Sequence, residues 1–190
     1  MTAQPRHVYT PAEYLARERA SDHKSEYSVG EIFALAGGSE QHNLIRGNVY
    51  ASFHSQLRRR ACTVYPSDMR VYVSRTGLYT YPDVSVVCGT AQFQDPHRDT
   101  LLNPTVIVEV LSSSPENYDR GKKFQHYRTL DTLEGYIVIA QNTTHVEHYT
   151  RQPNNQWLCE EFDDTSTVLT IAAIECVLAL QDVYEKVAFE

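Results

Sequence analysis

The sequence predicts an α/β (α+β) domain in which a mixed central β-sheet is flanked by helices on both faces. Segments with helical spacing of apolar residues begin at recognisable capping residues, and short β-branched runs are separated by turn residues. A strand–helix–strand segment over residues 105–141 is long enough for a crossover between parallel strands. The length of 190 residues suits a single domain spanning 1–190.

The first helix is predicted by "TPAE". Thr10 can cap the helix, Pro11 suits its first position, and Glu13 can complete a capping box. We expect this helix to end near Ala20. The stretch "KSEYSVGEIFALAGG" then predicts two short strands around a turn at Val29-Gly30.

A second helix is predicted over residues 39–60, beginning at Ser39. Its inward stripe has residues at spacings of three and four, with a histidine at its head: His42, Ile45, Val49, Phe53 and Leu57. Arg58 to Arg60 lie at its end, where cations suit the helix dipole.

The rest of the chain alternates strands with turns and one more helix. The expected strands are 62–65, 69–74, 79–87, 105–111, 134–141, 144–150, 157–163 and 167–171. The polar stretch Gly89 to Asn103 is expected to be a loop, and "LALQDVYEKV" a short final element. A helix over 115–130 is predicted with Ser113 or Ser114 as its cap and Pro115 just inside.

Composition narrows the class of protein. With 42% hydrophobic and 22% charged residues, the chain is typical of a globular protein. It has no apolar run of the roughly 20 residues that cross a bilayer, so no membrane partner is expected. The N-terminus lacks a secretory pattern, so we expect an intracellular, cytoplasmic protein. The net charge of −7 does not suggest a nucleic-acid coating protein, but it does not exclude an enzyme with a locally basic groove.

The cysteine spacing matches neither a zinc module nor a disulfide framework, so we expect reduced, mostly buried thiols. The four cysteines are Cys62, Cys88, Cys159 and Cys176. His145 and His148 are three residues apart, which on a strand places them on opposite faces and disfavours a zinc site.

Two carboxylates lie in β-branched surroundings where a lone charge is costly. Asp83 stands in "YPDVSVV", and Glu109 stands between Val108 and Val110. The predicted strands can bring the two acids together, where a divalent cation would offset their repulsion. Magnesium prefers such oxygen ligands together with waters.

The helix after Glu109 adds a cation. Asp119, Lys123 and Tyr127 are four residues apart and share one face, so Lys123 is placed to reach the end of the strand carrying Glu109. Its ammonium could orient a water or stabilise a phosphate in the transition state. Alternatively, Asp119 and Lys123 form an ordinary helical ion pair, Glu109 faces solvent, and Asp83 merely ends a turn.

These residues carry a family resemblance. The order of "YPDVSVV", "VIVEVLSSSPENYDRGKKFQHYRTL" and "EGYIVI" resembles the PD-(D/E)XK nuclease superfamily. With "GEIFALAGGSEQHNLI" and "SDMRVYV", the chain is more narrowly similar to the bacterial family described as putative restriction endonuclease, long catalogued as a domain of unknown function. The resemblance covers most of residues 9–187 and implies a restriction-endonuclease-like core.

The resemblance implies that Asp83 and Glu109 are metal ligands, joined by the backbone carbonyl of Val110. The superfamily lysine belongs two residues after the glutamate, where this chain has Leu111. In the narrower family the lysine has moved to the following helix, which matches Lys123, with Lys122 as an adjacent rival.

The superfamily often adds an acidic or polar group from the N-terminal elements. The candidates are His42, Glu40, Glu31 and Glu26. The sequence alone also allows His42 to be an ordinary core histidine, and Glu31 and Glu26 to be hairpin charges. "SSS" at Ser112 to Ser114 lacks a nucleophile elbow and is better explained as a helix cap.

The first functional hypothesis is an endonuclease that depends on Mg²⁺ or Mn²⁺ and hydrolyses DNA phosphodiester bonds. In it, Asp83 and Glu109 hold the metal, Lys123 positions or activates water, and Tyr127 or His42 supports the site. The second is a weak or inactive nuclease-like fold that serves as a nucleic-acid-binding or protein-interaction module. A third is a nuclease for RNA or a small nucleotide. Cleavage of both strands of a duplex would favour a homodimer.

Overall fold

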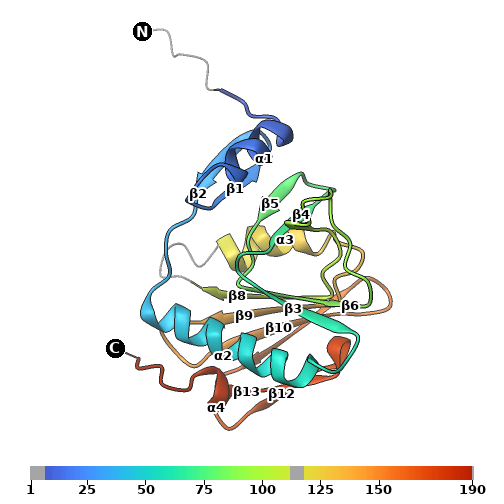
Figure 1. Ribbon diagram of the computed structural model, residues 1–190. Coiled ribbons are helices and arrows are strands. Elements are labelled where there is room, and N and C mark those ends of the chain that lie inside the picture. Colours follow the sequence, from blue (N-terminus) through green and yellow to red (C-terminus); the bar gives the residue numbers. More distant parts are fainter. Residues whose placement is uncertain (1–6, 112–117, 190) are drawn as a thin grey trace.

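The computed structural model describes residues 7–111 and 118–189, except the side chains of 118–120, and arranges their strands in three sheets (Figure 1). A five-stranded sheet has the order β2-β1-β5-β4-β7, a six-stranded sheet has the order β11-β10-β9-β8-β6-β3, and β12 pairs with β13. The strands of the five-stranded sheet are β1 (Ser25–Ser28), β2 (Glu31–Ala34), β4 (Arg70–Val73), β5 (Leu78–Thr80) and β7 (Thr100–Leu101). The others are β3 (Cys62–Pro66), β6 (Val84–Cys88), β8 (Val106–Leu111), β9 (Gly135–Ala140), β10 (Val146–Arg151), β11 (Trp157–Phe162), β12 (Val168–Ile171) and β13 (Cys176–Ala179).

Four α-helices accompany the sheets in the described parts: α1 (Pro11–Arg19), α2 (Glu40–Leu57), α3 (Phe124–Tyr127) and α4 (Leu180–Val183). A π-helical turn, Tyr118–Lys123, leads into α3. The predicted capping box of α1 is present, because the Thr10 hydroxyl accepts from the Glu13 backbone and the Glu13 carboxylate accepts from the Thr10 backbone. In this part of the chain, every helix is too short or too polar to cross a membrane.

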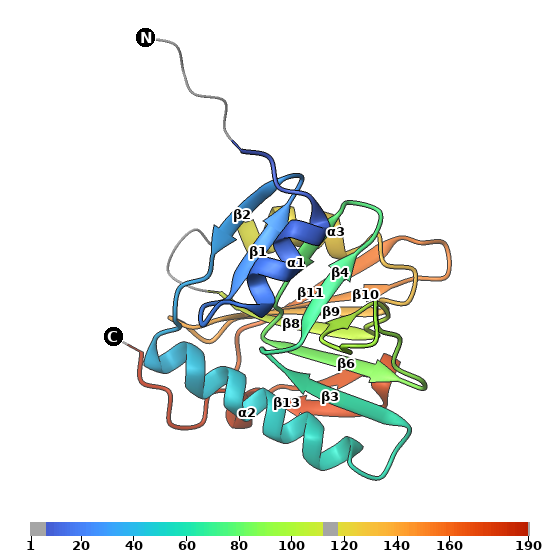
Figure 2. The same ribbon diagram turned by 45° about the horizontal axis from the view of Figure 1, so that its top comes forward.

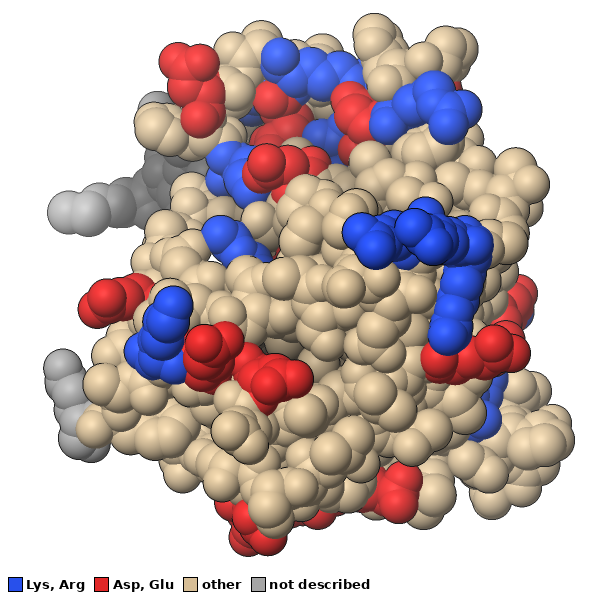
Figure 3. Space-filling model, turned by 60° about the horizontal axis from the view of Figure 1, so that its bottom comes forward, with Lys and Arg blue, Asp and Glu red and all other residues tan. Residues whose placement is uncertain are grey.

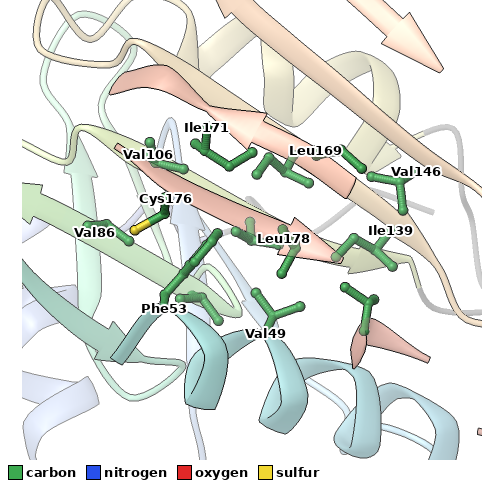
Figure 4. Close-up of a cluster of buried hydrophobic side chains, with 14 of the residues drawn as sticks. Val49, Phe53, Val86, Val106, Ile139, Val146, Leu169, Ile171, Cys176 and Leu178 are labelled. Atoms are coloured by element: carbon green, nitrogen blue, oxygen red, sulfur yellow. The ribbon is translucent and has the colours of Figure 1, made fainter. Parts of the chain in front are cut away.

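The predicted mixed sheet with a parallel crossover is confirmed. β8 and β9 pair in parallel and are joined through α3, whereas β6 pairs with β8 in antiparallel fashion. α2 and the β12–β13 hairpin cover one face of the six-stranded sheet, and α3 covers the other (Figures 1 and 2). Figure 4 shows side chains of α2, including Val49 and Phe53, pointing into the core toward Val86, Ile139 and Leu178.

The prediction of one continuous strand over 79–87 is wrong. β5 ends at Thr80 in the five-stranded sheet, and β6 begins at Val84 in the six-stranded sheet. Pro82 lies between them and has no N–H for a sheet ladder, which suits a chain that leaves one sheet and enters another. This change of sheet places Asp83 at the junction of the two sheets.

Other boundaries also differ from the sequence prediction. The expected loop Gly89 to Asn103 contains β7, and the C-terminal region forms an additional strand, β13. The helix predicted to reach Leu130 ends at Tyr127. Its proposed caps, Ser113 and Ser114, lie outside the described residues, as do Ser112 and Pro115.

The expectation that all four cysteines are reduced and mostly buried is wrong. Cys62 and Cys88 form a disulfide across the β3–β6 pair, where the register sets them directly opposite each other. Cys176 is buried as expected, but Cys159 is exposed. The sequence separation of 26 residues gives no hint of this pairing, because only the strand register brings the two thiols together.

Candidate active site

Asp83 directly precedes β6, and Glu109 lies on β8, the strand that pairs with β6. The last β6–β8 pair is Val84 with Val108, and beyond it the Asp83 carboxylate accepts a hydrogen bond from the backbone N–H of Val110, the residue after Glu109. Both acids are buried, with relative exposures of 7% and 4%. The structure therefore brings the two predicted acids together, while their role as metal ligands stays a prediction.

Asp83 is held at both carboxylate oxygens. Its Oδ2 accepts a hydrogen bond of 2.8 Å from the backbone N–H of Val110, and its Oδ1 lies 2.9 Å from His42 Nε2. His42 faces inward from the first turn of α2, as the stripe in the sequence predicted, and its ring contacts Asp83.

Glu109 meets the hydroxyl and the ammonium that follow it in the chain. Its Oε1 accepts a hydrogen bond of 2.7 Å from the Tyr127 hydroxyl and lies 3.3 Å from Lys123 Nζ. The same Nζ lies 3.2 Å from Oε1 of Glu26, on β1. The buried ammonium of Lys123 therefore bridges one carboxylate from each large sheet.

Two hydroxyls complete this network. The Thr80 hydroxyl donates to Glu26 Oε1 at 2.5 Å, and its oxygen lies 3.4 Å from that of Tyr127. Burial, reinforced by the negative charge of Glu109, raises the pKa of Tyr127 well above its ordinary value. Tyr127 therefore stays protonated and serves as a hydrogen-bond donor to Glu109.

The structure separates the two adjacent lysines. Lys123 is 7% exposed and faces the acids, whereas Lys122 is exposed. Leu111, which holds the usual lysine position, is buried on the same face as Glu109. The Asp119 side chain lies outside the described residues, so its predicted pairing with Lys123 stays a prediction.

Among the acids proposed from the N-terminal elements, Glu26 contacts the site, because its Oε1 lies 3.2 Å from Lys123 Nζ. Glu40 is exposed at the start of α2, and Glu31 is half-buried on β2. Sequence reasoning did not identify Thr80, which is fully buried. Its only sequence signal is its place three residues before Asp83, at the end of the first sheet.

Sequence reasoning also did not identify Gly38, which packs against the ring of His42. A Cβ built on Gly38 would lie 2.7 Å from Cδ2 and 3.0 Å from Cγ of the His42 ring. A Cβ on Gly37 would meet nothing within 4 Å. The ring of His42 therefore packs directly against a backbone position that has no room for a side chain.

Comparisons with known proteins identify the family of this chain. The family model described as "Uma2: Putative restriction endonuclease" matches residues 11–181. The chain belongs to this family. Two proteins of Synechocystis sp. are similar to this chain. The uncharacterized protein sll1609 is 38% identical over 154 residues, covering 81% of this chain and 87% of the relative. The uncharacterized protein slr1290 is 32% identical over 180 residues, covering 95% and 93%.

A solved structure shows the same fold. It is described as a putative nuclease belonging to DUF820 from Anabaena variabilis and superposes with a TM-score of 0.77. The two chains share 18% sequence identity, and the match covers 93% of this chain and 98% of the other. At this identity the likeness shows that the two chains share a fold.

The donor set of this Uma2 site suits a hard cation with few protein ligands. The described residues contain no group of three or more His, Cys, Asp and Glu side chains arranged for a metal. Magnesium, however, commonly takes one or two carboxylates plus waters. In an extended residue the N–H and the C=O point to the same side of the strand. The Val110 N–H donates to Asp83 beyond the last β6–β8 pair, so the Val110 carbonyl also points to the side of Asp83. His42 Nδ1 is buried and has no hydrogen-bond partner in the described parts. The carboxylates of Asp83 and Glu109 and the Val110 carbonyl are therefore a donor set that fits a magnesium ion with waters.

Proposed function

We propose that this Uma2 protein is an endonuclease that hydrolyses DNA phosphodiester bonds with Mg²⁺ or Mn²⁺. The observation that carries the proposal is that buried Asp83 bonds the backbone N–H next to buried Glu109, whose Oε1 lies 3.3 Å from Lys123 Nζ. Metal-assisted phosphoryl transfer uses neighbouring carboxylates to hold the metal and a fixed cation to stabilise the charge that develops on the phosphate. Family membership supports the nuclease class.

The metal would be held by Asp83, Glu109 and the Val110 carbonyl. When bound, it would supply Lewis-acid activation of a phosphoryl oxygen and a more acidic water. The protein groups around it have separate tasks. The N–H of Val110 and the His42 ring fix the orientation of Asp83, while the Tyr127 hydroxyl fixes that of Glu109.

Lys123 acts as a fixed positive charge rather than as a base. An ammonium that faces carboxylate oxygens of Glu26 and Glu109 is stabilised in its charged form. When a phosphate enters, the same cation can orient the attacking water and offset charge that develops on the phosphoryl oxygens. Glu26 and Thr80 keep the ammonium at the junction of the two sheets.

The second candidate is a binding module that has lost cleavage. It is favoured by one observation, the buried Leu111 where the superfamily places its lysine. This module would bind nucleic acid or another protein. The two functions differ in whether a metal-dependent cleavage product appears.

The test is nicking of a supercoiled plasmid with Mg²⁺, with Mn²⁺ and with EDTA. We expect metal-dependent nicking by the wild type and its loss in Asp83→Asn, Glu109→Gln and Lys123→Met. Arg59→Gln, an exposed change far from the site, serves as the control. Nicking that survives in all three site variants, or that is insensitive to EDTA, would refute the proposed site. Light scattering of the same samples tests the proposed homodimer.

A further inference from the structure

Two basic side chains meet beside the site, at the turn between β3 and β4. Lys24 donates from Nζ to Asp68 Oδ1 at 2.6 Å and to the Ser67 carbonyl at 3.1 Å. Arg46 donates from Nη1 to the Ser67 hydroxyl at 2.9 Å and from Nη2 to Asn43 Oδ1 at 2.7 Å. The two cations come from opposite sides of the junction, Lys24 from the α1–β1 connection and Arg46 from α2.

The position of this pair relative to the site follows from its neighbours. Arg46 comes one helical turn after His42, so the two side chains lie on the same face of α2. Lys24 Nζ lies 5.5 Å from the centre of the Tyr81 ring, and Tyr81 precedes Asp83 by two residues. The pair thus flanks the His42–Asp83 side of the site.

Positive charge is in excess around Lys24 and Arg46. Within the described chain, Arg46 forms no ion pair, since its hydrogen bonds go to a hydroxyl and an amide. Asp68 is the carboxylate that faces the pair, and its side chain is 83% exposed. The hydrogen bond and charge of Lys24, assisted by the charge of Arg46, lower the pKa of Asp68. Two cations therefore share one solvated anion, although the whole protein carries a net charge of −7.

A second basic group lies elsewhere and offers a comparison. Arg58 to Arg60 follow α2, about 20 Å from Arg46 along the helix at 1.5 Å per residue. Figure 3 shows a run of basic side chains toward one edge of the face drawn, with a largely uncharged area beside it. Arg60 already pairs with Glu175 at 3.8 Å and donates to its carbonyl. This arginine run has no contact with the site.

We propose that Lys24 and Arg46 form a subsite for a backbone phosphate of DNA, next to the phosphate that is cleaved. The inference rests on the proposed function in taking DNA as the substrate. Ser67 and Asn43 hold the guanidinium with neutral acceptors, and an arginine has five N–H donors, so donors remain for a phosphate. An arginine fork beside a lysine point charge suits a phosphate oxygen pair. The exposed Asp68 is displaced into solvent when the phosphate binds.

The test measures binding of a short fluorescein-labelled DNA duplex by anisotropy, in EDTA, over a series of NaCl concentrations. The logarithm of the affinity falls linearly with the logarithm of the salt concentration. Each lost phosphate contact should make this negative slope shallower by about 0.9 for duplex DNA. We expect Arg46→Gln and Lys24→Gln each to weaken binding and to make that slope shallower. Arg59→Gln makes the same charge change in the arginine run and should alter neither. Asp68→Asn removes the competing anion and should tighten binding.

The outcomes separate this subsite from the nuclease activity. If wild type fails to bind the duplex, or if Arg46→Gln and Lys24→Gln keep its affinity and slope, the subsite is refuted. The same holds if Arg59→Gln has the larger effect. A protein that binds through Lys24 and Arg46 but does not nick plasmid keeps the subsite and loses the proposed endonuclease function. Thermal unfolding of each variant confirms that it is folded.

Discussion

The sharpest consequence of the site geometry concerns the stability contributed by Lys123. Its ammonium lies 3.2 Å from Glu26 and 3.3 Å from Glu109, and these two acids are 5% and 4% exposed. Lys123→Met keeps the apolar stem of the side chain and removes only the charge. Both carboxylates then remain buried without the cation that bridges them.

Removing one partner of a buried ion pair costs about 3–5 kcal/mol. For a chain of 190 residues, each kcal/mol changes the melting temperature by about 2–4 °C, so we expect a decrease of roughly 6–20 °C. The assay is thermal and urea unfolding of wild type, Lys123→Met and Lys122→Met. The last variant makes the same chemical change at the exposed neighbour and should stay within about 0.5 kcal/mol of wild type.

A double variant tests the cause. Glu26→Gln removes one of the two stranded charges but keeps an oxygen for the Thr80 hydroxyl. The two changes should therefore be non-additive, with the double variant recovering about 0.5–3 kcal/mol relative to the sum of the single effects. Equal losses in Lys122→Met and Lys123→Met, or strict additivity with Glu26→Gln, would refute the bridging ammonium.

Three further predictions concern other parts of the fold. Gly38→Ala should displace the site histidine and reduce plasmid nicking at least tenfold, whereas Gly37→Ala should not, and equal activities in a plasmid assay would contradict this. Reduction of the Cys62–Cys88 disulfide, which closes a loop of 26 residues, should lower the free energy of unfolding by about 3.5 kcal/mol, measured in urea with and without reductant. Burial lowers the pKa of His148 in the folded protein. As the pH falls below about 6.5, His148 is therefore protonated in the unfolded chain before it is protonated in the folded one. The free energy of unfolding should then fall by up to 1.4 kcal/mol per pH unit. His148→Gln should make that loss smaller in unfolding curves recorded from pH 7 to about pH 5, and an unchanged pH dependence would exclude His148 as the cause.

Local signals in the sequence were sufficient for the starts of α1 and α2 and for the strand that carries Glu109. The capping residues of α1 and α2 and the apolar stripe of α2 depend on neighbours within one or two turns, and both helices begin where predicted. β-Branched runs on either side of Glu109 likewise placed β8.

Long-range register was beyond the sequence. Whether 79–87 is one strand or two depends on which sheets receive its halves, and that choice is made by tertiary packing. The disulfide between Cys62 and Cys88 depends on the same register. The choice of Glu26 over Glu31 and Glu40 required the position of the β1–β2 hairpin relative to α3, which is set by contacts far apart in the chain.

Asp83 shows why structure and chemistry are coupled at this site. Pro82 ends the ladder of the first sheet, and the last pair between β6 and β8 is formed by Val84. The N–H of Val110 lies beyond that pair, so the carboxylate of Asp83 takes the place of a backbone acceptor at this point of the sheet. An asparagine keeps an oxygen for that N–H and loses the charge, whereas an alanine loses both and leaves a buried donor unpaired. Asp83→Asn therefore separates the charge of Asp83 from its part in the sheet, and loss of cleavage with retained stability in that variant would identify the charge as the functional requirement.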